Sequence, residues 1–207
     1  MDLTFYISAF VTLFVIIDPI GLTPLFVAIT QGATGPERRV IALRAAAIAV
    51  GLLTLFGVFG EAVLGFVGIS MPAFRIAGGI LLFLTALDML FERRTKRRED
   101  QAEEEDRPDP SVFPLATPLI AGPGAMATMI LLTGQVEGHV GATVGVHLVM
   151  AAVIGLVLIL FLAAGLIERA LGKTGINVIT RLLGMLLAAL SVQFVLDCLS
   201  GLGLLTG

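Results

Sequence analysis

The chain has 207 residues, of which 57% are hydrophobic and only 14% are charged, and its mean hydropathy is +1.01. A soluble domain has about 25% charged residues, so this composition excludes a soluble globular protein and indicates an integral membrane protein. The net charge of −3 identifies no partner, and the single cysteine excludes an internal disulfide. Because the N-terminus lacks the positive segment of a cleavable signal, we expect the first apolar segment to be retained as a membrane helix.

Six apolar segments are long enough to cross a bilayer, which takes about 20 residues as a helix. They cover approximately 5–29, 40–59, 72–91, 112–132, 140–166 and 178–199. The only long polar segment, 92–110, places a basic block before an acidic block. This pattern is typical of a solvated linker, and binding of a cytoplasmic partner is the alternative.

The basic residues predict the orientation of the spans. All but one of the 13 Lys and Arg residues lie in or next to the connections that follow the first, third and fifth spans, and the exception is Arg75. The positive-inside rule therefore places these three connections in the cytoplasm and both termini on the outer side.

The first apolar segment is interrupted at its centre. Proline removes a backbone donor and blocks the preceding helical turn, so Asp18-Pro19 and Pro24 predict a helix that is broken at membrane depth. Broken backbone is tolerated there only where it is buried in protein or lines a cavity. Asp18 is a favoured N-cap directly before a proline at the first helical position, and Gly21 lets a ligand approach bare backbone.

The fourth segment has the same pattern of a capping residue followed by proline, at Thr117-Pro118 and at Gly122-Pro123, with Gly124 next to it. Each break presents the N-terminus of a half-helix, with free N–H groups and a partial positive charge, to the middle of the protein. The sequence therefore predicts an anion site between the breaks, and a carboxylate suits it.

An internal repeat relates the two halves. Residues 61–70 match 168–177 at an offset of 107, Arg75 and Arg181 correspond at 106, and Pro19 and Pro123 at 104. Each half holds three spans, an odd number, so the second copy enters the membrane from the opposite face. An inverted repeat with broken helices in corresponding positions is typical of a secondary transporter whose site lies near the midplane.

The repeat also contains a pair of acids and a pair of arginines. Glu61 and Glu168 precede Arg75 and Arg181, and each acid is expected to pair with its own or the neighbouring arginine. Such pairs either brace the hairpins of spans two–three and five–six or act as gates.

Three motifs resemble the MarC family of bacterial inner-membrane proteins, which includes small neutral amino-acid transporters. They are DPIGLTPLF at 18–26, GISMPAFRIAGGILLF at 68–83 and PLATPLIAGPGAMATMI at 114–130. The resemblance implies six spans, a location in the bacterial inner membrane, and uptake of alanine, glycine, serine or threonine driven by a proton or another ion such as sodium. Two alternatives stay open, an exporter of the amino-acid efflux type and a non-transporting membrane scaffold or sensor.

We therefore expect an all-α polytopic protein of two inverted three-helix repeats, 1–91 and 111–207, joined by the linker 92–110. The broken spans one and four face each other. No enzyme motif, cofactor, metal site or nucleic-acid partner is expected, because no P-loop, HExxH or Cys-His cluster is present. The predicted substrate site comprises Asp18, Pro19, Gly21, Thr23, Pro24, Thr117, Gly122, Pro123 and Gly124.

Two kinds of site residue have a structural alternative. Asp18 either only caps a half-helix or also binds an ammonium group, a coupling cation or a transported proton. Thr23 and Thr117 either contact the substrate or bond their own backbone four residues back. Four other glycines are expected to permit close helix packing, namely Gly78, Gly79, Gly155 and Gly184.

Overall fold

The computed structural model describes residues 3–91, 93 and 109–203. Most of the predicted linker 92–110 lies outside these residues. All regular elements of the described part are helical, which confirms the predicted all-α membrane fold. In chain order they are α1 (Leu3–Ile17), α2 (Pro19–Ile29), α3 (Gly35–Val67), α4 (Met71–Leu90), η1 (Ser111–Ile120), α6 (Pro123–Gly134), α7 (Val140–Leu162) and α8 (Ala164–Gly201).

The helices provide five to six membrane spans. Five continuous stretches within the described residues are long and apolar enough to cross a bilayer, and α1 with α2 form the first of them, Leu3–Ile29. A sixth span results if η1 and α6, which are bent by 56° at their junction, cross the membrane as one unit. The structure therefore supports five to six spans, and the predicted sixth span depends on this bent pair.

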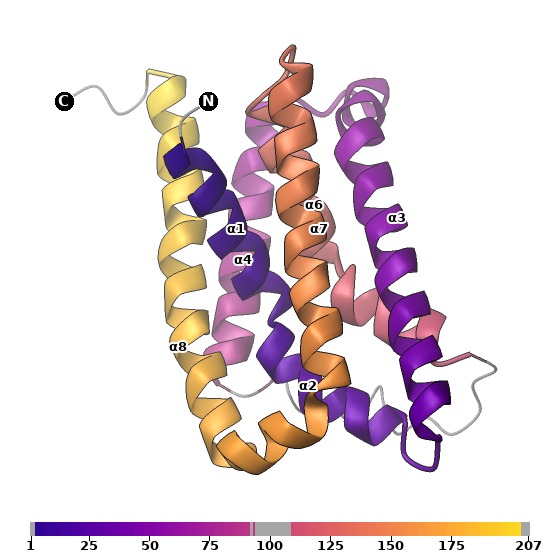
Figure 1. The fold of residues 1–207 in the computed structure, drawn as a ribbon. Coiled ribbons are helices and arrows are strands. Elements are labelled where there is room, and N and C mark those ends of the chain that lie inside the picture. The colour runs from indigo at the N-terminus through magenta and orange to yellow at the C-terminus, as the bar shows by residue number, and fades with distance from the viewer. Residues whose placement is uncertain (1–2, 92, 94–108, 204–207) are drawn as a thin grey trace.

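Both termini lie at one end of the helix bundle, and the α2–α3 and α7–α8 connections lie at the other (Figure 1). This is the grouping that the basic residues predict. Which end faces the cytoplasm remains a prediction from charge.

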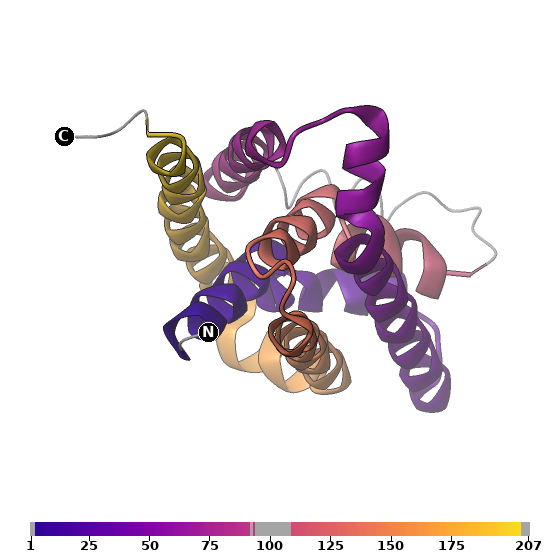
Figure 2. The same ribbon diagram turned by 90° about the horizontal axis from the view of Figure 1, so that it is seen from above.

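The broken spans form the centre of the molecule. In the most apolar window of Leu3–Ile29, 61% of the residues are buried, whereas in the four other continuous spans only 22–33% are. Nearly all residues of α6 from Ala125 to Thr133 are also buried. The longer helices surround this pair (Figure 2) and expose large apolar side chains such as Phe66, which is 93% exposed. We assign these surfaces to contact with lipid.

Corresponding spans of the two halves touch each other. α1 of the first span contacts α6 of the fourth, α3 contacts α7, and α4 packs along α8. A pseudo-two-fold axis would produce this pattern, and the inverted repeat itself remains a prediction. The bends do not follow the predicted match between the halves. Their positive φ values occur at Gly68 (81°) and Gly172 (60°), whereas the repeat pairs Gly68 with Gly175 and Gly65 with Gly172.

α4 and α8 approach closely through glycines, as predicted for Gly79 and Gly184. A Cβ atom added at Gly79 would lie 2.7 Å from Val195 Cγ2, and one at Gly184 would lie 2.9 Å from Met89 Cβ. Gly155 was expected to act in the same way, and this prediction is wrong, because a Cβ there would meet nothing within 4 Å.

The start of η1 is tied to α3 on the surface. Asp109 Oδ1 accepts hydrogen bonds from the Ser111 backbone N–H at 3.0 Å and from Ser111 Oγ at 2.6 Å, and Asp109 Oδ2 lies 3.5 Å from Arg44 Nη1. The Ser111 hydrogen bonds, with a smaller effect of Arg44, hold the pKa of Asp109 below its ordinary value. An exposed ion pair of this kind contributes about 0–1 kcal/mol, so it orients the segment more than it stabilises the fold.

Substituting the same residue at two glycines tests the α4–α8 contact. Gly79→Ala should destabilise the protein by about 1–3 kcal/mol, because the new methyl group overpacks the contact with Val195 and the Ser191 carbonyl. Gly155→Ala, the matched control, should be neutral or stabilising by up to about 1 kcal/mol, because it meets no atom and favours the helix. Unfolding in one detergent measures both variants, and a Gly79→Ala variant as stable as the control would contradict the packing.

Candidate functional site

Asp18 is the residue at which the first span breaks. Its backbone has φ 58° and ψ 63°, a left-handed conformation that few residues other than glycine, asparagine and aspartate adopt readily. Its N–H donates to Phe14 O at 2.9 Å and so ends α1, while its Oδ1 accepts from Gly21 N at 3.0 Å and so begins α2. The predicted cap is therefore present, and the side chain has no exposed surface.

Gly21 and Pro24 complete the first break. A Cβ atom at Gly21 would collide with Asp18 Oδ2, so the cap requires glycine at this position. Pro24 lies inside α2 and has no N–H, which leaves the carbonyl of Ile20 without its helical donor. Helical carbonyls point toward the C-terminal end of their helix, so this carbonyl points along α2 and away from the Asp18 carboxylate.

The hydroxyl groups near the breaks bond mainly to their own helices. Thr23 Oγ1 donates to Pro19 O at 3.0 Å, and Thr128 Oγ1 donates to Gly124 O at 2.8 Å. With its proton used in this way, Thr23 is able to accept from an ammonium group but not to donate to a carboxylate. Thr117 is half-buried, has extended backbone (φ −133°, ψ 124°), and its side chain makes no hydrogen bond among the described residues.

The second break differs from the first in having no side-chain cap. α6 begins with Pro123 after Gly122, whose carbonyl accepts from Met126 N at 3.0 Å and which has no side chain to bond the first turn. The N–H groups of Gly124 and Ala125 lie in the first turn of α6, where no carbonyl of the same helix is available to accept from them. Within the described part of the chain, no other acceptor meets them. This is the half-helix N-terminus that the sequence predicts.

The second break lies beside the end of α1. A Cβ atom at Gly124 would come within 2.9 Å of Ile16 Cδ1, which places the first turn of α6 on the last turn of α1, two residues before Asp18. That the residues of the two proline motifs form one site stays a prediction. The contact is made of backbone and one aliphatic side chain, so little space remains between the breaks.

Accessibility differs between the two breaks. Asp18, Pro19 and Thr23 are buried, whereas Pro123 is exposed and Gly122 and Gly124 are half-buried. The first break is closed in this conformation, and the second is partly open.

The predicted acid–arginine pairs take a different form. Arg75 donates from Nη2 to Gly134 O at 3.3 Å, and Glu61 interacts with both the Glu137 carboxyl and the Arg75 guanidinium. Sequence reasoning missed Glu137, because it lies in the short connection after α6 and no motif marks it. The Glu168 side chain lies outside the described residues, and Arg181 lies on α8 in the second half.

The comparisons with known proteins cover nearly the whole chain. The family described as "MarC family integral membrane protein" matches residues 3–202. UPF0056 membrane protein YvbG of Bacillus subtilis is 36% identical over 98% of this chain and 97% of its own length, and UPF0056 membrane protein MJ1677 of Methanocaldococcus jannaschii is 35% identical over 97% and 98%. UPF0056 inner membrane protein YhgN of Escherichia coli K12 is 35% identical over 92% and 94%. No solved structure matches this chain.

Two substitutions at Asp18 separate its capping role from its charge. Asp18→Ala should lower stability by about 2–3 kcal/mol, because it removes the cap to Gly21 and places alanine in a left-handed conformation. Asp18→Asn, the matched control, keeps an acceptor and tolerates that conformation, so it should stay within about 1 kcal/mol of the wild type. Thermal unfolding in detergent measures the difference, and equal stability of the two variants would show that the cap contributes nothing.

Proposed function

This chain belongs to the MarC family of integral membrane proteins, and from its two broken spans we propose that it is a secondary transporter of small neutral amino acids. The observation that carries the proposal is the contact between the breaks, where the uncapped N-terminus of α6 lies against the turn that precedes buried Asp18. Broken helices that meet in the core of a membrane protein are typical of transporter sites.

The second break is suited to a carboxylate. At the first break, the Asp18 carboxylate accepts from Gly21 N and so satisfies the start of α2. At the second break, Gly122 supplies no such group, and the N–H groups of Gly124 and Ala125 point from a positive helix terminus without an acceptor. We infer that a substrate carboxylate takes at α6 the place that Asp18 takes at α2.

The first break is suited to an ammonium group. Asp18 supplies a carboxylate and Thr23 a hydroxyl oxygen with an acceptor site left. A charged aspartate at membrane depth costs about 3 kcal/mol, and a bound cation offsets that cost. The same groups suit a proton or sodium ion, and this is the route by which we expect transport to be coupled to a gradient.

The proposed substrate is small because the breaks are close. A Cβ atom at Gly124 would already lie 2.9 Å from Ile16 Cδ1 and 3.8 Å from Leu82 Cδ2, so a bulky substrate side chain would displace these residues. The closed first break and the partly open second break support a step of an alternating-access cycle that is open on one side. Uptake and export use the same geometry, and the driving gradient sets the direction.

Ligand-dependent stability of the purified protein tests binding. Alanine, glycine, serine and threonine should each raise the melting temperature, because a ligand present at 100 times its Kd stabilises the folded state by about 2.7 kcal/mol. Leucine, which exceeds the space, and alaninamide, which lacks the carboxylate, are the matched controls and should have little effect. If no zwitterion raises the melting temperature of a demonstrably folded protein, the result contradicts the amino-acid transporter and favours the scaffold or sensor alternative.

Uptake into proteoliposomes tests the coupling role of Asp18. Asp18→Asn keeps the cap and removes the charge, so it should retain the fold and abolish the pH dependence of alanine uptake. Wild-type protein assayed in parallel, with and without an imposed pH gradient, is the control. If uptake by the Asp18→Asn variant keeps the same pH dependence, Asp18 only caps α2 and does not couple transport to protons.

A further inference from the structure

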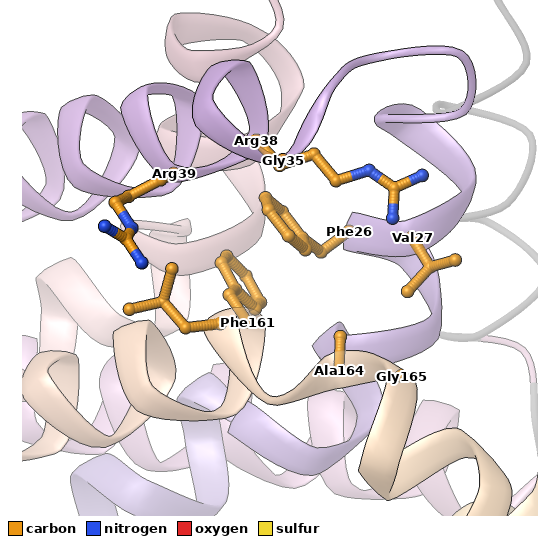
Figure 3. Close-up of a pocket in the computed structure, with 9 residues that line it drawn as sticks. Phe26, Val27, Gly35, Arg38, Arg39, Phe161, Ala164 and Gly165 are labelled. Atoms are coloured by element: carbon orange, nitrogen blue, oxygen red, sulfur yellow. The ribbon is translucent and has the colours of Figure 1, made fainter.

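A cavity lies where α2, the start of α3, the end of α7 and the start of α8 meet, at the end of the bundle opposite the termini. Its volume is about 190 Å³ (Figure 3). Phe26 and Phe161 line it as a parallel stack, with ring centroids 4.3 Å apart and an interplanar angle of 6°. Both rings are almost completely buried, so they give the cavity a fixed wall.

Two consecutive arginines flank these rings, and among the residues that the structure describes no acidic side chain lines the cavity. Arg38 and Arg39 lie on either side of the stacked rings in Figure 3. Arg38 Nε donates to Thr30 O at 3.2 Å, which fixes that guanidinium group and leaves its terminal nitrogens available. Arg39 is exposed, and within the described residues it has no hydrogen-bond or ion-pair partner. The cavity therefore carries two positive charges that no described residue on its walls neutralises.

The position of these arginines in α3 strengthens the case for an anion. Both lie in the first two turns of a 33-residue helix, at its positive end, where a cation is unfavourable. The nearby Glu37 does not compensate them directly, because its carboxylate accepts from Thr34 N at 2.7 Å and from Thr34 Oγ1 at 2.9 Å in a capping box. An anion in the cavity would be attracted by both guanidinium groups and by the helix terminus.

The surroundings place the cavity at the level of lipid headgroups. Leu162, which lines it, is 52% exposed at the end of the membrane-spanning α7, and Val40, next to Arg39, is 50% exposed. Basic groups therefore meet lipid-facing apolar surface here, at the end that the positive-inside rule assigns to the cytoplasm. The cytoplasmic leaflet contains anionic lipids, and basic pockets between membrane helices bind the headgroups of such lipids.

The volume of the cavity limits which part of a lipid molecule fits inside it. A cavity of about 190 Å³ compares with about 30 Å³ per water molecule in the liquid, so it holds a phosphate group with a few waters but not acyl chains. The chains would lie outside, over the exposed apolar side chains of Leu162 and Val40.

We propose that this cavity binds the phosphate group of an anionic phospholipid of the cytoplasmic leaflet, with Arg38 and Arg39 as its ligands. The site joins the second half of the broken first span to the α7–α8 connection, so an occupied site links two parts of the fold that are distant in sequence. The proposal is independent of whether the protein transports amino acids.

Native mass spectrometry of the full chain, delipidated and then titrated with phosphatidylglycerol or phosphatidylcholine, tests the site. We expect one tightly retained phosphatidylglycerol and no retained phosphatidylcholine. Arg39→Gln should weaken phosphatidylglycerol binding about fivefold, the effect of one basic residue near an anionic surface, and Arg39→Lys should largely restore it. Arg93→Gln is the matched control, because it removes one exposed arginine from the same predicted side outside the cavity and should leave binding unchanged.

Melting temperature in neutral lipid reports whether each variant is folded. Equal loss of binding in Arg39→Gln and Arg93→Gln would overturn the site, since general surface charge would then explain the retention. A second arm adds inorganic phosphate to the lipid-free protein. If phosphate alone at millimolar concentration stabilises the wild type but not Arg39→Gln, the cavity is a site for a soluble oxyanion and the lipid assignment is overturned.

Discussion

The constraint on which the structure depends is that every backbone polar group inside a bilayer needs a partner. The regular hydrogen bonding of the membrane helices is interrupted at two breaks, and the free backbone groups are treated differently at each. Asp18 folds its own carboxylate onto the start of α2, which requires a left-handed backbone and a glycine three residues later. Gly122 has no side chain to cap the start of α6, so N–H groups of its first turn are left for a ligand to bond.

The remaining helices make these two breaks possible. Irregular backbone is stable at membrane depth only when protein surrounds it, and α3, α4, α7 and α8 provide that surround (Figure 2). The glycines between α4 and α8 let two long helices pack at backbone distance, which closes the bundle around α1 and α6. The lipid-facing surfaces need only be apolar, whereas the centre combines apolar packing with a few polar groups of fixed geometry.

Features set by local chemistry were predictable from the sequence, and features set by long-range packing were not. The cap at Asp18, the start of α6 at Gly122-Pro123 and the apolar spans follow from residues adjacent in the chain. The absence of packing at Gly155 and the approach of Glu137 to Glu61 depend on which helices become neighbours, and the cavity beside Arg39 requires four segments far apart in sequence. The hydroxyl of Thr23 had two possible partners, and only its rotamer decides between them.

The most direct test of the central claim is the amide signal of Gly124 in protein carrying ¹⁵N-labelled glycine, recorded with and without saturating alanine. If the substrate carboxylate caps α6, this amide should gain a hydrogen bond and its proton signal should move downfield, while alaninamide leaves it in place. Gly155, where an added Cβ atom would meet no atom within 4 Å, supplies an internal reference in the same spectrum. Alanine that binds, by an independent measure, without moving the Gly124 signal would contradict the claim that the second break receives the carboxylate.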